Sequence, residues 1–201
     1  MKNLSLTLLL SLLAIPAFTQ VRPGFRLGVN ASGVQYELGS GPWRTYIGGT
    51  AGLLLEIPVA DRLSVQPEIA YSERAQRIEF TDVNGEPLGK SRFVFSFLEV
   101  PLLVKYRFGT ERTRLYLQAG PQYGYNLAAW SRVEGERLSL DLTESDFVRH
   151  DLSGVLGMGV QFARFLVDAR YGHGFTSRIR NFDRGDGQRY RTGTLSLGYQ
   201  F

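Results

Sequence analysis

His150, Asp151 and Ser153 lie close together in the sequence and are residue types that hydrolases and acyltransferases use for catalysis. The surrounding residues alternate as in a β-strand, and neighbouring strand residues point to opposite faces of a sheet. His150 and Asp151 are therefore not expected to converge, and the second histidine, His173, is isolated. We expect no catalytic residues and no cofactor. Two histidines and no cysteines also make a metal site improbable on chemical grounds.

Charged residues recur at alternate positions within otherwise apolar segments, where they would share one face of a strand. They are the acids Glu56, Glu68, Glu99, Asp151 and Asp168 and the bases Lys105, Arg107 and Arg170. They could line a conductive path or form a structural network of ion pairs. Buried charges need partners, and the near balance of signs makes pairing possible. We expect a structural network in which Glu99 and Lys105 join charges of neighbouring strands.

A second group of basic residues falls near the C-terminal end of the sequence, namely Arg178, Arg180, Arg184, Arg189 and Arg191. The planar guanidinium group is well suited to phosphate. A loop of this kind could contact lipopolysaccharide phosphates, and an ordinary solvated loop is the equal alternative. Nucleic-acid binding is not expected, because no recognition fold accompanies the charge.

The elements that would position these residues are β-strands with period-two alternation. In the clearest segment, 97–108, Leu102 and Val104 share an apolar face opposite Glu99 and Lys105. A lysine or arginine facing lipid at mid-depth costs about 2 to 4 kcal/mol, so the charged face must point into a lumen. Similar alternation is found in seven further segments, 25–32, 47–57, 63–72, 115–126, 151–162, 165–175 and 192–201. The prolines inside these segments should mark bulges or distorted pairings, because proline removes a ladder donor; they are Pro67, Pro101 and Pro121.

The connections between these segments alternate in length, which is typical of outer-membrane barrels. Short turns are expected at 58–62, 109–113 and 163–164, and long polar loops at 33–45, 73–92, 128–150 and 176–191. These connections join eight strands and leave both termini on the short-turn side, which is the periplasmic side in such barrels. We predict an all-β fold, an eight-stranded antiparallel up-and-down transmembrane β-barrel. Eight strands enclose an interior that side chains can fill, which favours a plugged lumen.

The N-terminal segment has the order of a secretory signal peptide. Lys2 precedes an apolar run at 4–15, and Pro16 and small residues follow. We predict that residues 1–19 are removed and that residues 20–201 form one outer-membrane barrel domain. The absence of cysteine excludes disulfides and a lipid-modified cysteine.

Several strings in the sequence resemble the PorT-type outer-membrane barrels of Bacteroidetes-like bacteria, in the order of that family. They are Glu56-Ile57-Pro58, Gln66-Pro67-Glu68 with Tyr71-Ser72, Leu98-Glu99-Val100-Pro101-Leu102-Leu103-Val104-Lys105-Tyr106, Ala119-Gly120-Pro121 and Asp168-Ala169-Arg170-Tyr171. The resemblance implies an outer-membrane location and insertion by the barrel-assembly machinery, which reads an aromatic C-terminus. The sequence ends Leu197-Gly198-Tyr199-Gln200-Phe201, with Ser196 where that signal usually has glycine. Most of the family has no assigned activity, and a few members belong to a secretion apparatus.

These observations favour a non-enzymatic outer-membrane barrel whose long loops bind lipid, surface polymers or proteins. A narrow porin for small solutes and a component of a secretion apparatus are open alternatives. A soluble barrel that holds an apolar ligand is a third. Such a barrel should be apolar inside, whereas Glu99 and Lys105 are expected inside this one.

Overall fold

The computed structural model describes residues 21–35, 46–81, 87–110, 113–133, 136–140, 148–176 and 189–201. These residues form nine β-strands, β1 (Arg22–Gln35), β2 (Tyr46–Pro58), β3 (Leu63–Thr81), β4 (Pro87–Gly109), β5 (Thr113–Val133), β6 (Glu136–Leu140), β7 (His150–Phe162), β8 (Phe165–Gly174) and β9 (Arg189–Gln200). Within this part of the chain, no helix has the length and apolar character that crossing a membrane requires.

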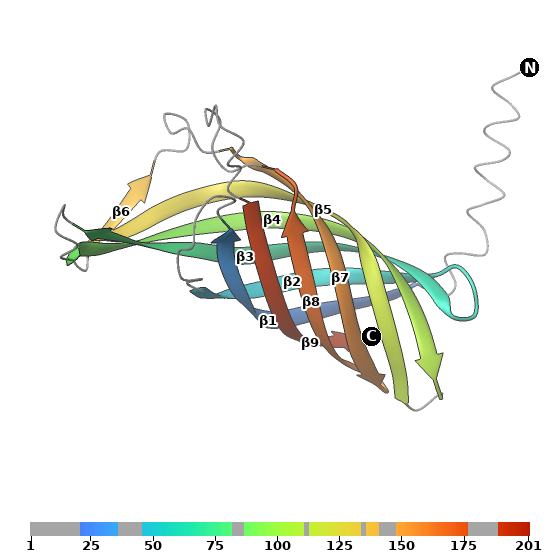
Figure 1. Ribbon diagram of the computed structural model, residues 1–201. Coiled ribbons are helices and arrows are strands. Elements are labelled where there is room, and N and C mark those ends of the chain that lie inside the picture. Colours follow the sequence, from blue (N-terminus) through green and yellow to red (C-terminus); the bar gives the residue numbers. More distant parts are fainter. Residues whose placement is uncertain are drawn as a thin grey trace, which may run out of the picture.

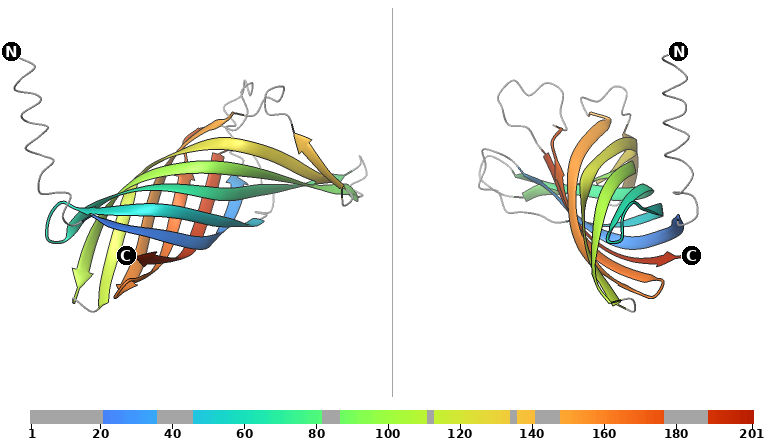
Figure 2. Two further views of the ribbon diagram at one scale, coloured as in Figure 1. Left: turned by 180° about the vertical axis from the view of Figure 1, so that it is seen from behind. Right: turned by 90° about the vertical axis from the view of Figure 1, so that its right-hand side faces the viewer.

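Eight of the strands close into a barrel, whose strands run obliquely around the axis (Figures 1 and 2). The pairing order is β4-β3-β2-β1-β9-β8-β7-β5, and β4 pairs with β5 to join the two ends. All of these pairings are antiparallel. Each barrel strand therefore has a neighbour on both sides, which satisfies backbone groups that lipid cannot. The predicted eight-stranded antiparallel barrel is confirmed.

All four predicted long loops contain strand residues, which corrects the expectation from the sequence. The loops 33–45 and 176–191 each lose three residues, to the end of β1 and the start of β9, and the other two lose more. Within 73–92, β3 continues to Thr81 and β4 begins at Pro87, so the two strands extend past their barrel neighbours as a long hairpin (Figure 1). Within 128–150, β5 continues to Val133 and pairs with β6, a short strand outside the eight of the barrel. These polar stretches lack the apolar alternation that lipid demands, so their strand character left little trace in the sequence.

Pro67, Pro101 and Pro121, which lie in the middle of strands, interrupt pairing without shifting its register. The β3–β4 pairing stops at Pro67 and the β4–β5 pairing stops at Pro101, and each resumes three residues further along in the same register. Pro121 on β5 lies opposite the second interruption. The register shift between β4 and β5 lies elsewhere, between Ser96 and Phe97. The prolines thus distort pairing rather than form bulges.

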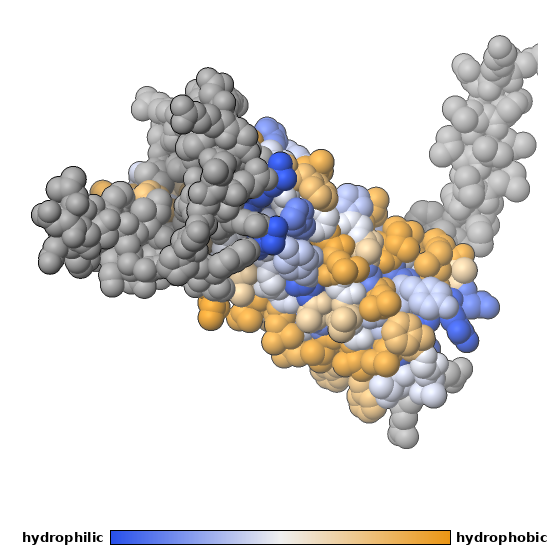
Figure 3. Space-filling model, viewed as in Figure 1, coloured by the Kyte–Doolittle hydropathy of each residue, from blue (hydrophilic) through white to orange (hydrophobic). Residues whose placement is uncertain are grey.

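Apolar side chains cover the outer wall of the barrel, and polar side chains fill the inside. On β4, which pairs with β3 and β5, Leu102 and Val104 are each 49% exposed. Lys105 on the same strand is fully buried. Figure 3 shows hydrophobic residues over much of the visible barrel wall. Among the described residues no second layer covers this wall, which therefore has the polarity of a surface solvated by lipid.

Aromatic side chains gather at the short-turn end of the outer wall. The Tyr199 ring lies 5.3 Å from the Phe165 ring and 5.6 Å from the Phe201 ring, between centroids. Tyr106 and Phe108 form a further pair at the end of β4. Aromatic girdles of this kind mark the boundary between the hydrocarbon and the headgroups.

A charge on the lipid-facing wall tests this arrangement. We expect Leu102→Arg to lower the free energy of unfolding in bilayers by about 2 to 4 kcal/mol, because the guanidinium would face hydrocarbon. The measurement is urea unfolding of the protein in lipid vesicles. The control is Val59→Arg, which places the same group in the exposed turn between β2 and β3. Equal stability of the two variants would contradict a lipid-facing position for Leu102.

Candidate functional site

The polar lumen of the barrel gathers ten buried charged side chains. The eight that the sequence predicted to point inward are all buried, and they are Glu56, Glu68, Glu99, Lys105, Arg107, Asp151, Asp168 and Arg170. Arg26 and Arg74 are buried with them. The described lumen thus holds five acids and five bases.

Sequence reasoning missed Arg26 and Arg74 for different reasons. Arg26 lies on the face opposite Phe25 and Leu27, so the alternation of β1 contained the signal. Arg74 was assigned to a long loop, although it follows Ser72 by two residues and shares its buried face. Extending β3 by one pair of residues would have found it.

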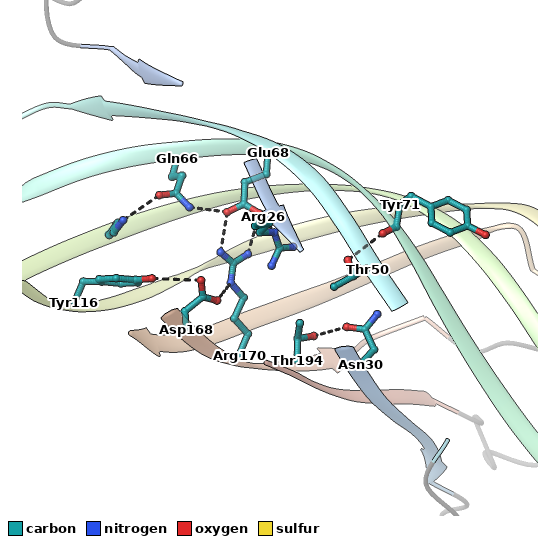
Figure 4. A network of polar contacts seen from close by, with 11 residues as sticks. Arg26, Asn30, Thr50, Gln66, Glu68, Tyr71, Tyr116, Asp168, Arg170 and Thr194 are labelled. Carbon is teal, nitrogen blue, oxygen red and sulfur yellow. Dashed lines mark hydrogen bonds and ion pairs between the residues drawn. The ribbon is translucent and has the colours of Figure 1, made fainter. Parts of the chain in front are cut away.

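The middle cluster, formed by Arg26, Glu68, Asp168, Arg170 and Tyr116, joins opposite walls of the barrel (Figure 4). Arg170 Nη1 and Nη2 on β8 donate to Glu68 Oε2 and Oε1 on β3 at 2.8 and 2.9 Å. Arg26 Nε lies 3.0 Å from Glu68 Oε2. The Glu68 carboxylate therefore faces two guanidinium groups.

Asp168 completes the middle cluster from the side of β8. It accepts a hydrogen bond from Arg170 Nε at 2.7 Å and one from the Tyr116 hydroxyl at 3.3 Å. Tyr116 is 2% exposed, and a Cβ atom at Gly159 would collide with its ring. The glycine thus makes room for a large aromatic side chain of the lumen.

The short-turn cluster consists of Glu56, Lys105 and Arg107, with Gln66 and Gln200 beside them. Glu56 Oε2 lies 2.7 Å from Lys105 Nζ, and Glu56 Oε1 lies 2.8 Å from Arg107 Nη1. Gln200 donates to Glu56 at 3.1 Å, and Lys105 donates to Gln66 at 3.3 Å. Gln66 in turn donates to Glu68 at 2.6 Å, which connects this cluster with the middle one.

The long-loop cluster consists of Arg74, Glu99 and Asp151, with two aromatic rings. Arg74 Nη2 donates to Glu99 Oε1 at 2.7 Å, and Arg74 Nη1 donates to Asp151 Oδ2 at 2.7 Å. The guanidinium carbon of Arg74 lies 4.6 Å from the centre of the Phe97 ring and 5.1 Å from that of Tyr190. The cation is therefore held by two carboxylates and two ring faces.

Little free space is left among these side chains. The cavity between the middle and long-loop clusters, lined by Arg26, Arg74, Glu99 and Arg170 among others, has a volume of about 20 Å³. That volume accommodates on the order of one water molecule. The lumen in this region is a packed polar core rather than a channel.

The residues that suggested catalysis lie on different faces. His150 is exposed on the outer wall and contacts the Tyr123 hydroxyl through Nδ1. Asp151 points into the lumen toward Arg74, and the Ser153 hydroxyl donates to the backbone carbonyl of Gln122. The three therefore form no catalytic triad. In the described part of the chain, no group of three potential metal ligands comes together.

The arginine-rich segment near the C-terminal end is described only in part. Arg178, Arg180 and Arg184 lie outside the described residues. Arg189 and Arg191 lie in the first residues of β9, at the long-loop end, and Arg189 is exposed.

Removal of Glu68 tests the role of the middle cluster. We expect Glu68→Ala to lower the free energy of unfolding by about 3 to 5 kcal/mol, because Arg26 and Arg170 would lose the carboxylate between them. The measurement is urea unfolding in lipid vesicles, and the loss of heat-modifiable gel migration reports the unfolded fraction. Asp61→Ala removes a carboxylate from an exposed turn and serves as the control. If both variants unfold at the same urea concentration, the buried pairs do not stabilise the barrel.

Comparison with known proteins agrees with this architecture. The family model described as outer membrane protein beta-barrel domain matches residues 18–180. A search of curated proteins finds no match.

Solved structures similar to this chain include the attachment invasion locus protein Ail of Yersinia pestis, in complex with the heparin analogue sucrose octasulfate. It is 20% identical, with 90% of this chain and 99% of that chain covered and a TM-score of 0.48. Neisserial surface protein A is 12% identical, with 89% and 97% covered and a TM-score of 0.49. The outer membrane enzyme PagL is 13% identical, with 86% and 98% covered and a TM-score of 0.43. The family model covers well over half of the 201 residues. The chain therefore belongs to the outer membrane protein β-barrel domain family and is a protein of the bacterial outer membrane.

Proposed function

We propose that this barrel is a non-enzymatic outer-membrane protein that passes no solute and acts through its long-loop end. The observation that carries the proposal is the lumen, in which five buried acids and five buried bases leave a cavity of about 20 Å³ in the described interior. A solute path would need either a wider barrel or the rupture of several buried ion pairs. The separation of His150 from Asp151 and Ser153 supports the absence of catalysis.

The orientation of the barrel is part of the proposal. We infer that the short turns and both chain ends face the periplasm and that the long connections face outward. In barrels of this class the periplasmic turns are short and the extracellular loops are long. The turns at 59–62 and 163–164 are short, whereas ten residues of sequence separate β1 from β2 and fourteen separate β8 from β9 at the other end.

The biogenesis predicted from the sequence fits this orientation. We propose that residues 1–19 are a cleaved signal peptide and that residues 20–201 insert as one domain through the barrel-assembly machinery. Leu197 and Phe201 are 65% and 66% exposed on the outer wall, so the C-terminal apolar residues present one continuous face. Membership of the PorT-type family is a narrower hypothesis that rests on the sequence resemblance. A role in a secretion apparatus, as some members of that family have, is an alternative function.

The proposed partner at the long-loop end is lipopolysaccharide. Arg189 and Arg191 lie at the start of β9, and Arg191 pairs along the backbone with His173 of β8. Tyr171 and Phe175 contact His173, so cationic groups lie beside an aromatic face. The phosphates of lipopolysaccharide would bind the cationic groups, and its acyl chains would pack against the aromatic face. Arg178, Arg180 and Arg184, which lie outside the described residues, belong to the same arginine-rich stretch of the sequence.

Conductance in planar bilayers tests the filled lumen. We expect no large, stable conductance from the reconstituted protein, because the buried ion pairs block the axis. A general porin in the same bilayers provides the positive control. Regular, long-lived conductance steps would replace the present proposal with a narrow porin.

Binding to lipopolysaccharide tests the long-loop end. We expect the double variant Arg189→Gln/Arg191→Gln to bind lipopolysaccharide about tenfold more weakly, because charge-assisted contacts to phosphate are lost. The measurement is surface plasmon resonance with the protein held in nanodiscs. Arg62→Gln/Arg114→Gln makes the same charge change at the opposite end. If both double variants bind as the unaltered protein does, these arginines are not lipopolysaccharide contacts.

A further inference from the structure

The barrel mouth at the short-turn end forms an open vestibule that the proposed function does not use. It has a volume of about 700 Å³ and lies between the β2–β3 and β4–β5 turns. Arg22, Arg62, Arg107 and Arg114 line it, and Asp61 is the acid among the described lining residues. A smaller hollow of about 210 Å³ adjoins it through Arg22 and Arg114. The combined space falls within the size range of small-molecule sites.

The charge of this mouth is not balanced by the lumen beneath it. Glu56 is the carboxylate at the floor, and three cations share it. Lys105 and Arg107 lie within 3 Å of its oxygens, and Arg22 lies 3.8 Å away. The middle and long-loop clusters, by contrast, contain four acids and three bases. Among the buried charges of the described lumen, bases therefore outnumber acids only in the short-turn cluster, which has one acid and two bases.

Arg107 connects the floor of the vestibule to its rim. Its side chain is 7% exposed, and its Nε atom is buried without a hydrogen-bond partner. Arg22 and Arg114 lie near enough to repel it electrostatically. The repulsion among these cations raises the free energy of the unoccupied site. A bound anion would reduce that repulsion.

We propose that the vestibule binds a phosphoryl group carrying at least two negative charges. Guanidinium groups match the oxygens of phosphate in pairs, and several of them converge here from different strands and turns. Arg62 and Arg114 at the rim contact the ligand directly. Arg22 and Arg107 lie deeper and contribute positive electrostatic potential that attracts it. The phosphoryl group can belong to a soluble phosphorylated molecule or to an anionic phospholipid headgroup.

The test uses the full barrel in phosphatidylcholine nanodiscs, in which both mouths are accessible, and inorganic pyrophosphate as the probe. We expect saturable binding in isothermal titration calorimetry. Arg62→Gln/Arg114→Gln should weaken it at least about tenfold, since two charge-assisted contacts are removed. Both residues lie outside the buried clusters, and heat-modifiable gel migration verifies that the variant is folded.

The control is Arg149→Gln, which removes a guanidinium group at the opposite end and should leave pyrophosphate binding unchanged, because Arg149 belongs to neither proposed anion site. Absence of saturable binding in the unaltered protein, or an equal loss in Arg62→Gln/Arg114→Gln and in this control, would overturn the proposal. This test does not depend on lipopolysaccharide binding or on conductance, so its failure is distinct from failure of the proposed function.

A second arm identifies the source of the phosphoryl group. In nanodiscs of phosphatidic acid, whose headgroup is a phosphate monoester able to carry two negative charges, a lipid headgroup that occupies the vestibule would abolish pyrophosphate binding by the unaltered protein. Pyrophosphate binding of similar strength in both lipids would instead support a soluble phosphorylated ligand. Either result supports a phosphoryl site at this mouth.

Discussion

The pairing of charges inside the closed barrel constrains the rest of this molecule. Backbone hydrogen bonds join neighbouring strands, whereas several of the ion pairs join strands that are not neighbours. Arg170 on β8 holds Glu68 on β3 across 102 residues of sequence, and Arg74 on β3 holds Asp151 on β7 across 77. An unpaired charge in this interior would cost several kcal/mol, so each of these residues depends on a partner from a distant segment.

The same constraint explains why the barrel is polar inside and apolar outside, which is the reverse of a water-soluble protein. Lipid solvates leucine and valine on the outer wall, and the charged side chains are solvated by one another within the lumen. Glycines and small residues let the large inner side chains fit, as Gly159 does for Tyr116. The result is an interior with little room for water and a wall without an unpaired strand edge along the barrel.

Because side chains fill the lumen, ligands can reach charged groups only at the two ends of the barrel. These two ends differ in their charge. At the long-loop end, Arg74 is neutralised by two carboxylates, and the arginines near the start of β9 lie beside aromatic residues. At the short-turn end, a single buried carboxylate, Glu56, is surrounded by three cations beneath an open vestibule. Binding of anions at both surfaces, rather than transport between them, is the behaviour that this distribution of charge favours.

Period-two alternation in the sequence was sufficient to predict the eight barrel strands, their connections at the short-turn end and the side on which residues such as Leu102 and Lys105 lie. That inference works because lipid imposes one physical rule on every strand, and each strand shows it independently. The sequence did not reveal the extension of β3 and β4, the strand β6 or the place of Arg74, because these segments lie where lipid no longer selects the pattern. It also could not reveal which acid pairs with which base, nor that three cations meet at Glu56. Those facts follow from the register and closure of the barrel, which bring together side chains that are far apart in the chain.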